Sequence, residues 1–324
     1  MDNKIYNEEI KMDFLKGYEE DTAKTYQYAL VKAADTERLF EKDLYDFSLA
    51  DIRKVMFDIN PNTINHAISI GSIFKTYINW AIENGYRMSN INPLDLVQPS
   101  WYEQFIDKTK KLYISEEELD YIISNLVNAQ DAVILQLLFL GVRGYKSSEI
   151  LNLKKDDIDW ENGILHLRDD RKGERELVLP EESREKILRL LRQALNETEY
   201  QKRNGESKAL NPILKLIESD HVVRNAVTRT EGSADEHLVY RRITTIKEIF
   251  NFPFINPINI ERSGMIKLAK DIYLRDGKLE NEQLKEVAKY FNIEPRIING
   301  KETYNYVNLR QYLNLDVIKS LYDI

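Results

Sequence analysis

Arg143 and Lys146 lie in a glycine-containing turn that directly follows an apolar stretch of the chain. The leucines from Leu137 to Leu140 are too apolar to be exposed, so the turn begins beside a buried helix. Cationic groups held at such a turn are suited to binding an anion, and a planar guanidinium can donate two parallel hydrogen bonds to phosphate oxygens. The alternative is an ordinary solvated connection between helices that carries surface cations.

Further cations follow in two groups, which are Arg168, Arg171, Lys172 and Arg175, and the adjacent pair Arg241 and Arg242. Each group is compatible with a phosphate-binding groove or with a solvated face of the protein. The net charge of −8 argues against a broad positive surface that coats nucleic acid without sequence preference. It still permits a focused basic groove.

The composition argues against metal, disulfide and membrane chemistry. Cysteine is absent, as in proteins of a reducing cytosol, and the four histidines at positions 66, 166, 221 and 237 show no metal-ligand spacing. The longest apolar run, from Ala132 to Val142, is too short to span a bilayer. We therefore expect a cytoplasmic protein with no cofactor, no metal and no membrane contact.

Apolar spacing predicts the elements that hold these cations. An apolar helix ends at Gly141, and a second amphipathic helix carries Ile150 and Leu153. Residues 164–179 alternate on either side of a polar turn, which predicts a β-hairpin that ends before Pro180. A helix over 181–196 follows. The polar segment 197–236 has only weak periodicity, which fits an insertion or a loop.

Two domains are expected. Residues 1–96 predict a compact helical domain. Asp21 or Thr22 is the expected N-cap of one helix, and Ser48 is that of the next. A third helix begins beside Asn62, where the polar side chains suit a helix cap. Residues 97–111 read as a polar linker. A second domain spans 112–324, and Ser115 caps its first helix. The predicted fold class is mainly α with a small β-hairpin or sheet.

The segment from Arg143 to Asp159 resembles the first box of the phage integrases, the tyrosine recombinases. The shared pattern is Gly-x-Arg, a Ser-Glu pair, an apolar run and a closing Asp-Ile-Asp, and the resemblance covers nearly the whole chain. It implies a helical core-binding domain followed by an α+β catalytic-type domain, with an arginine that grips the scissile phosphate. Counting from the first glycine gives Arg143, whereas counting back from Glu149 gives Lys146. We favour Arg143.

The second box departs from the family pattern. Arg262 supplies its arginine, but Asn259 stands in the place of a histidine, and Ile293 replaces another histidine further on. The resemblance identifies Lys172 with the lysine that protonates the leaving oxygen and Tyr304, ahead of Tyr306, with the nucleophile. Each positioned acid or base contributes roughly 10²–10⁴ in rate. The resemblance therefore implies a protein that keeps the cations and has lost strand transfer, and so is not an active enzyme.

The N-terminal domain is similar to the core-binding domain of integrases, through an early Thr-x-x-x-Tyr element and a helix that ends in Trp-Ala and a glycine before Asn-Pro. This resemblance implies DNA contacts, in which amides and imidazoles read base edges and lysines bind phosphates. The candidates here are Lys24, Thr25, Tyr28, Asn62, Thr63, Asn65, His66 and Lys75. Those in the second domain are Arg143, Lys146, Lys172, Arg175, Arg241, Arg242 and Arg262.

The chain as a whole also resembles the repressors of SPβ-type prophages, which share this fold and keep lytic genes silent. This implies a sequence-specific repressor that maintains lysogeny, with double-stranded operator DNA and a regulatory phage protein or peptide as partners. An active integrase with Tyr304 as nucleophile and a helical module that binds no DNA are the alternatives. The amphipathic tail from Leu309 to Ile324 fits docking on a neighbouring subunit or on its own domain.

Overall fold

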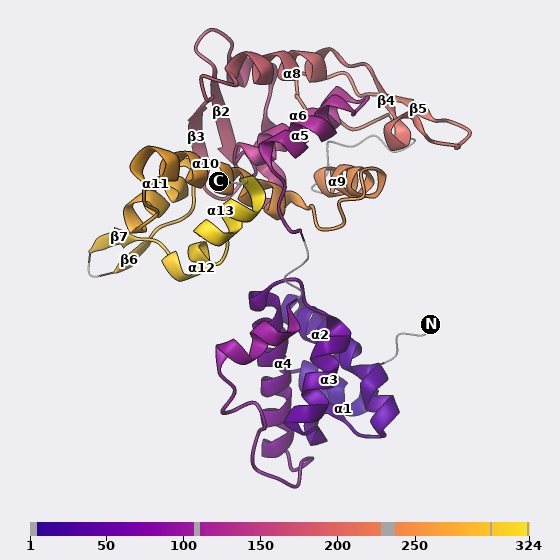
Figure 1. Ribbon diagram of the computed structural model, residues 1–324. Coiled ribbons are helices and arrows are strands. Elements are labelled where there is room, and N and C mark those ends of the chain that lie inside the picture. Colours follow the sequence, from indigo (N-terminus) through magenta and orange to yellow (C-terminus); the bar gives the residue numbers. More distant parts are fainter. Residues whose placement is uncertain (1–4, 107–110, 228–236, 299, 323) are drawn as a thin grey trace. The chain divides into compact units, whose positions relative to one another are not determined.

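The chain folds into two compact units, residues 1–110 and 111–324. The computed structural model describes residues 5–106, 111–227, 237–298, 300–322 and 324 (Figure 1). Parts of the predicted linker and of the polar segment 197–236 therefore lie outside the described residues. Each unit has its own hydrophobic core. Within the described ranges, no helix is both long and apolar enough to cross a membrane.

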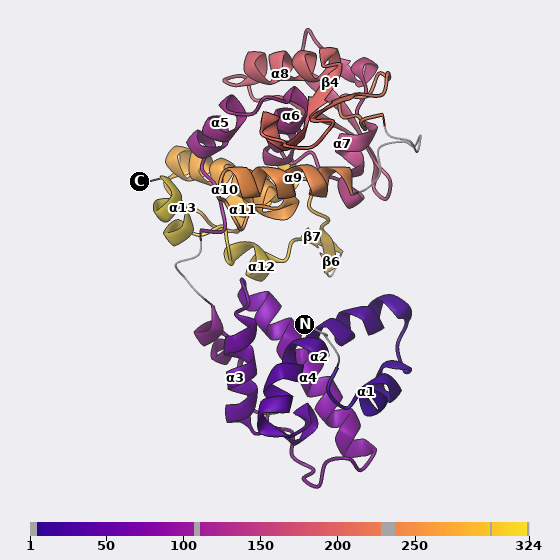
Figure 2. The same cartoon turned by 90° about the vertical axis from the view of Figure 1, so that its right-hand side faces the viewer.

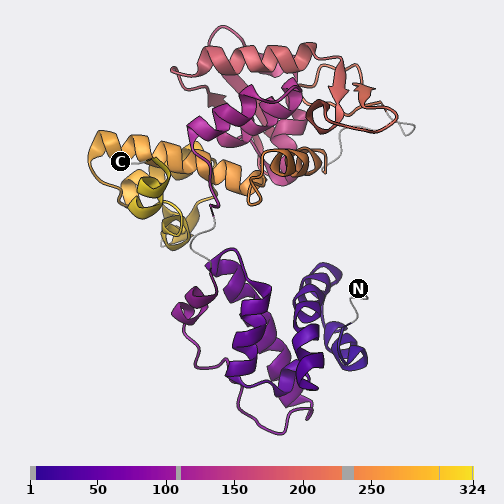
Figure 3. The same ribbon diagram turned by 45° about the vertical axis from the view of Figure 1, so that its right-hand side comes forward.

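The described part of the first unit is built from helices and loops. Its elements are α1 (Glu8–Leu15), α2 (Glu20–Phe40), η1 (Leu44–Asp46), α3 (Leu49–Ile59), α4 (Ile64–Glu83) and η2 (Pro99–Phe105). Helix α2 packs against α3 and α4 (Figure 3). The apolar faces of these helices form a core that includes Leu30, Ile52 and Phe74. Phe14 of α1 joins this core, because its ring packs edge-on against Tyr77 with 5.1 Å between the ring centroids.

Capping side chains fix the starts of α3 and α4. Ser48 and Asp51 form the predicted capping box at α3, in which the Asp51 N–H donates to Ser48 Oγ at 3.2 Å. At α4, the Thr63 hydroxyl accepts from the His66 N–H at 3.2 Å. The polar residues beside Pro61 thus include a true helix cap, which is the role that the sequence offered as the alternative to DNA contact.

The predicted cap of α2 at Asp21 or Thr22 is wrong. The N-cap residue is Glu19, two residues before Asp21, and it makes no side-chain capping hydrogen bond, so the helix begins at Glu20. Asp21 therefore lies inside the first turn, where the positive end of the helix dipole stabilises a carboxylate. Charge in the first turn replaces the expected cap.

A buried polar network joins α1 to the rest of the first unit. The side chain of Lys11 is fully buried, and its Nζ donates to Glu37 Oε1 at 2.6 Å and to Asp43 Oδ2 at 3.2 Å. The hydroxyl of Tyr77 donates to the other Asp43 oxygen at 2.9 Å. Buried charges persist only when they are paired in this way, so the network fixes the position of α1.

The second unit begins with helices and a small sheet. Its elements up to the polar segment are α5 (Glu116–Ser124), α6 (Ala129–Phe139), η3 (Tyr145–Ser147), α7 (Ser148–Asn152), η4 (Lys155–Asp157), β1 (Ile158–Asp159), β2 (Ile164–Asp169), β3 (Gly173–Val178) and α8 (Arg184–Asn196). The three strands are antiparallel in the order β1-β2-β3, and Leu165 lies opposite Leu177. The predicted hairpin is therefore present, and Ser115 caps α5 as expected.

The rest of the unit is built around the preceding helices. Its elements are β4 (Glu199–Gln201), η5 (Lys202–Gly205), β5 (Ile213–Lys215), α9 (Leu238–Ile249), α10 (Pro257–Asp276), α11 (Asn281–Tyr290), β6 (Arg296–Ile298), β7 (Lys301–Thr303), α12 (Tyr306–Arg310) and α13 (Leu315–Tyr322). The described part of the polar segment folds onto the core, where Val222 and Val223 are buried. Ile318 of α13 is buried with Ile266 of α10, so the tail packs on its own unit.

Helix α6 is the centre of the second unit. Every residue from Gln130 to Phe139 is buried, and the helix contacts α5, α8, α9 and α10 (Figures 1 and 2). A helix that is buried on all sides needs no solvent-facing polar side, which explains why most of its residues are apolar. The turn that carries Arg143 leaves the C-terminal end of this helix, so its position is fixed by the core.

The pKa of Glu37 predicts how the stability of the first unit depends on pH. Burial, partly offset by Lys11, raises the pKa of Glu37 from 4.5 to about 7. The protonated carboxyl therefore contributes stability that is fully present below pH 4.5 and is lost as the pH rises through about 7. The expected loss of unfolding free energy is on the order of 3 kcal/mol.

Glu37→Gln mimics the protonated form, so its unfolding free energy should vary less between about pH 5 and about pH 8. Urea unfolding of the two proteins at both pH values measures the difference. Glu9→Gln, at an exposed position of α1, is the matched control and should keep the wild-type pH dependence. An equal pH dependence in wild type and Glu37→Gln would contradict this account of the network.

Candidate functional site

An open cavity of about 570 Å³ in the second unit brings together cations that are far apart in the sequence. It is lined by the turn after α6, by the β2–β3 hairpin turn, by α10, by the segment after α11 and by Tyr312. The cations in its wall are Arg143, Arg171, Lys172, Arg175 and Arg262. We call this the phosphate cavity. No group of three or more His, Cys, Asp or Glu side chains in the described residues could hold a metal ion.

The turn after α6 places Arg143 in this wall. Gly141 and Gly144 have φ angles of 83° and 69°, in the left-handed region that glycine favours. A Cβ on Gly144 would lie 2.8 Å from Cγ of Glu149, so the turn is also too tight for a side chain there. Lys146 is not among the residues that line the cavity. Of the two candidates for the first-box cation, only Arg143 is therefore in the cavity.

Arg143 is held by a carboxylate that engages one of its donors. Its Nε donates to Glu261 Oε2 at 2.7 Å, and the side chain of Arg143 is 35% exposed whereas that of Glu261 is 9% exposed. Burial raises the pKa of Glu261, and the charge of Arg143 opposes that rise. The terminal amino groups of Arg143 keep their donors for an anion in the cavity.

Arg175 also lines the cavity, but its hydrogen bonds hold the turn after α6 in place. Its Nε donates to Glu149 Oε1 at 2.6 Å, and its NH2 group donates to Glu149 Oε2 at 2.9 Å and to the carbonyl of Gly141 at 2.8 Å. These bonds hold α7 and the turn against the hairpin. Arg175 was predicted to contact DNA, but its described hydrogen bonds fix the turn that carries Arg143.

The remaining cations of the wall are less constrained. Nζ of Lys172 donates to the carbonyl of Asn292 at 2.6 Å, and the guanidinium of Arg171 stacks on Tyr145 at 3.4 Å from the ring centroid. Arg262 lies 4.8 Å from the ring centroid of Tyr312. Among the described residues, no carboxylate forms an ion pair with Lys172, Arg171 or Arg262. These side chains therefore keep charge available for an anion.

Two positions that carry histidine in the family pattern, 259 and 293, carry no acid or base here. Ile293 lines the cavity and has no polar side-chain atom. Asn259 does not line it, because its Nδ2 donates to the carbonyl of Phe254 at 2.8 Å near the start of α10. The wall of the cavity contains no histidine.

Tyr304 does not line the cavity, whereas Tyr145 and Tyr312 do. Tyr304 is 7% exposed and packs in the core cluster of α10 and α11, outside the cavity. The hydroxyl of Tyr312 donates to Sδ of Met265 at 3.4 Å, and burial raises its pKa to about 12. Tyr312 could not be singled out from the sequence, because it lies in the tail and is one of 19 tyrosines.

The prediction that Arg242 contacts DNA needs correction. Its side chain is buried, its NH1 lies 3.4 Å from Asp131 Oδ1, and its guanidinium stacks on Tyr200 at 3.2 Å from the ring centroid. Burial raises the pKa of Asp131 to about 6. This contact anchors α9 to α6 inside the core, so the guanidinium cannot reach a ligand. The adjacent Arg241 is exposed on the same helix.

The candidates of the first unit lie on α2, at the start of α4 and, in the case of Lys75, in the middle of α4. Lys24 pairs with Glu20 at 2.6 Å, and Lys75 pairs with Asp95 at 2.9 Å. Tyr28 is 55% exposed. The other candidates are the exposed Thr25, Asn62 and Asn65 and the partly exposed Thr63 and His66. All of them reach the surface, at least in part.

Comparison with known proteins decides the family. Residues 113–323 match the family model of the MrpR C-terminal catalytic domain, and residues 5–83 match that of the MrpR N-terminal core-binding domain. The chain belongs to the MrpR family. It is 31% identical to the SPbeta prophage-derived protein YopR of Bacillus subtilis strain 168, over 98% of this chain and 97% of YopR.

More distant similarities confirm the predicted fold. Tyrosine recombinase XerC of Staphylococcus aureus strain Mu3 is 25% identical, over 89% of this chain and 95% of XerC. The Tn1549 transposon integrase in complex with a circular-intermediate DNA has 13% identity and a TM-score of 0.50, with 96% of each chain covered. This MrpR family member therefore has a mainly helical, two-domain fold of the tyrosine-recombinase type with small sheets.

The contrast between Arg175 and Arg171 predicts the effect of removing each charge. Arg175→Met leaves the buried carboxylate of Glu149 without its cation, which should lower the unfolding free energy by about 3–5 kcal/mol. Arg171→Met removes an exposed cation, so its expected effect is below about 1 kcal/mol. Chemical unfolding of the two variants measures both values. Similar losses of unfolding free energy in the two variants would contradict the claim that the buried carboxylate of Glu149 needs the charge of Arg175.

Proposed function

We propose that this protein is a sequence-specific double-stranded DNA-binding repressor that keeps prophage lytic genes silent in the bacterial cytosol. In this proposal, the phosphate cavity grips a phosphate of the DNA backbone without cleaving it. The observation that carries the proposal is a wall with cations that have no carboxylate partner among the described residues, and with no histidine. Such a wall can bind an anion, and among the described residues it lacks the histidines that the family pattern has for proton transfer.

The donors of the cavity suit one phosphodiester group. The terminal amino groups of Arg143 can bind two phosphate oxygens in parallel, whereas Lys172 acts as a point charge. Arg262 adds a third cation next to the ring of Tyr312. Carboxylates of Glu149, Asp169, Glu261 and Glu294 also line the cavity, so the excess of positive charge is small. A phosphodiester carries a single negative charge, which this small excess suits.

Sequence preference would come from the first unit. Backbone phosphates carry no base sequence, so a repressor needs side chains that read base edges. The amides of Asn62 and Asn65 and the imidazole of His66 can do this from the start of α4. The Tn1549 integrase, which shares the fold, is described in complex with DNA, and YopR is described as prophage-derived. Both descriptions support DNA binding in a prophage.

The absence of histidine from the described wall of the cavity supports the proposed loss of strand transfer. Cleavage needs groups that take up and deliver protons as the phosphate reacts. Asn259 is engaged with the Phe254 carbonyl and Ile293 is apolar, so neither can do so. Binding needs only charge and geometry, so it survives these replacements.

An active recombinase is the second candidate function. Tyr312 favours it, because it is a phenol in the cavity wall beside Arg262. Tyr304, the nucleophile expected from the sequence, is buried outside the cavity. A covalent bond between a tyrosine and DNA distinguishes the recombinase from the repressor.

The proposal predicts binding without a covalent product. Purified protein incubated with fragments of its own prophage and host genome should retain discrete fragments near promoters. Binding should weaken steeply between low and moderate salt, because each neutralised phosphate releases counterions. A parallel denaturing gel should show no protein attached to DNA. Tyr304→Phe and Tyr312→Phe should bind like wild type.

An adduct that disappears in either tyrosine variant would establish the recombinase instead. Binding that changes little with salt, or no binding to any fragment, would point to a protein interaction module.

A further inference from the structure

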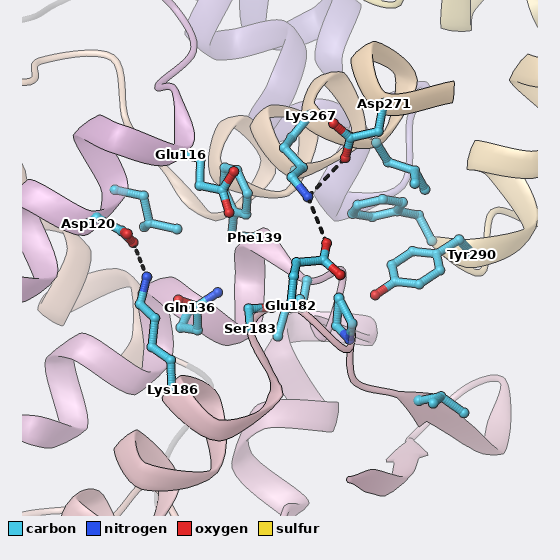
Figure 4. Close-up of a pocket in the computed structure, with 17 residues that line it drawn as sticks. Glu116, Asp120, Gln136, Phe139, Glu182, Ser183, Lys186, Lys267, Asp271 and Tyr290 are labelled. Carbon is cyan, nitrogen blue, oxygen red and sulfur yellow. Dashed lines mark hydrogen bonds and ion pairs between the residues drawn. The ribbon is translucent and has the colours of Figure 1, made fainter. Parts of the chain in front are cut away.

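A second cavity lies in the second unit (Figure 4). It is lined by α5, α6, α10, α11 and the segment that leads into α8. It has a volume of about 190 Å³. Its apolar wall consists of Leu119, Phe139, Leu140, Val178, Pro180, Leu268 and Phe291. An apolar cavity of roughly 150 Å³ can hold a benzene molecule. This one is therefore large enough for a phenyl-sized group.

Carboxylates outnumber lysines around this cavity. Lys267 lies between Asp271 and Glu182, at 2.9 Å and 3.3 Å, and Lys186 pairs with Asp120 (Figure 4). Burial lowers the pKa of Lys267, but its hydrogen bond to Asp271 and the surrounding carboxylates outweigh this effect and raise it. Both lysines are thus neutralised by their partners.

One buried acceptor remains unmatched, and a carboxylate lies at the same cavity. Glu116 lines the cavity, is partly exposed and forms no ion pair with any described residue, although its charge helps to raise the pKa of Lys267. Gln136 is 5% exposed, and its Oε1 has no hydrogen-bond partner within the described part of the chain. Buried acceptors are normally satisfied, so an unmatched one at a cavity indicates a missing donor. Because carboxylates outnumber lysines around the cavity, this donor should be a cation.

We propose that this cavity, here called the amine cavity, binds a small protonated amine that carries a phenyl-sized apolar group. The apolar group fills the space beside Phe139 and Leu268. The ammonium donates to Oε1 of Gln136 and lies near the carboxylate of Glu116. Neither the binding site nor its ligand class depends on the proposed function.

Phe291 connects the amine cavity to the phosphate cavity, because it lines both. Its ring is tightly held: a Cβ on Gly141 would lie 2.6 Å from it, and a Cβ on Gly264 would lie 3.2 Å from it. The next residue, Asn292, accepts the hydrogen bond from Lys172. A ligand that displaces the ring therefore moves the groups that position Lys172 and the Arg143 turn.

Occupation of the amine cavity should accordingly weaken the grip on DNA. This consequence rests on the proposed function, whereas ligand binding itself does not. Because coupling between two sites is reciprocal, DNA should lower the affinity for the amine by the same factor.

Calorimetric titration of the full-length protein tests the site, with 2-phenylethylamine, 2-phenylethanol and phenylacetate as probes of the same shape and different charge. The amine should bind most tightly and the acid most weakly. Glu116→Gln should weaken amine binding by roughly threefold to fivefold, the range of a partly exposed ion pair. The matched control is Glu117→Gln, at an exposed position that does not line the cavity, and it should bind like wild type.

A blocking variant gives an independent test. Val178 is 57% exposed at the rim, so Val178→Trp can cover the cavity without repacking the core, and it should abolish amine binding. Equal affinity for the three probes would overturn the cationic ligand class. Unchanged amine binding in both Val178→Trp and Glu116→Gln would overturn the site.

Coupling is measured as the affinity for a retained DNA fragment with and without saturating amine. We expect a loss of at least about fivefold, at the lower end of ordinary allosteric coupling, and no loss in Val178→Trp. Failure of wild-type protein to bind DNA in the absence of amine would count against the proposed function alone. DNA binding that ignores a bound amine would overturn the coupling and leave the amine cavity in place.

Discussion

The buried carboxylate of Glu149 is the contact on which the candidate site depends. It binds the guanidinium of Arg175 through both oxygens and accepts the backbone N–H of Arg143 at 2.9 Å. One side chain thereby joins the turn after α6, the helix α7 and the hairpin that carries Lys172. The glycines of the turn permit this approach, because a Cβ on Gly144 would collide with Glu149. Without the pair, the phosphate cavity would lose the arrangement of its wall.

In the proposed function, the cavity holds a phosphate without reacting with it. Electrostatic grip requires only that cations be fixed near the place of the anion, which Arg143 and Arg262 satisfy. Proton transfer requires groups with a pKa near neutrality, and the wall has isoleucine at 293 and no histidine. Glu261 also favours binding of a phosphate over its cleavage. Its carboxylate orients Arg143 through Nε and, where ionised, opposes the extra negative charge that builds up when a phosphate is attacked.

Much of the fold could be predicted from local signals. Alternation and glycines predicted the hairpin of Lys172, and an apolar run that ends in a glycine turn predicted the place of Arg143. Contacts between distant segments could not be predicted in this way. Tyr312 reaches the cavity because the tail folds over α10, and no local spacing encodes that contact. Arg242 reads as a surface cation until Asp131 of α6 packs against it in the core.

The central claim is that one backbone phosphate occupies the phosphate cavity, and neutralising phosphates one at a time tests it most directly. A bound operator duplex would carry a methylphosphonate at each position in turn, and its affinity would be measured with wild type, with Arg262→Gln and with Arg275→Gln. Arg275 lies on the same helix outside the cavity and pairs with Glu286 at 2.8 Å. At one position only, the losses of binding free energy from the methylphosphonate and from Arg262→Gln should be less than additive. The losses from the methylphosphonate and from Arg275→Gln should be additive at every position. Additive effects of Arg262→Gln at all positions would contradict the account.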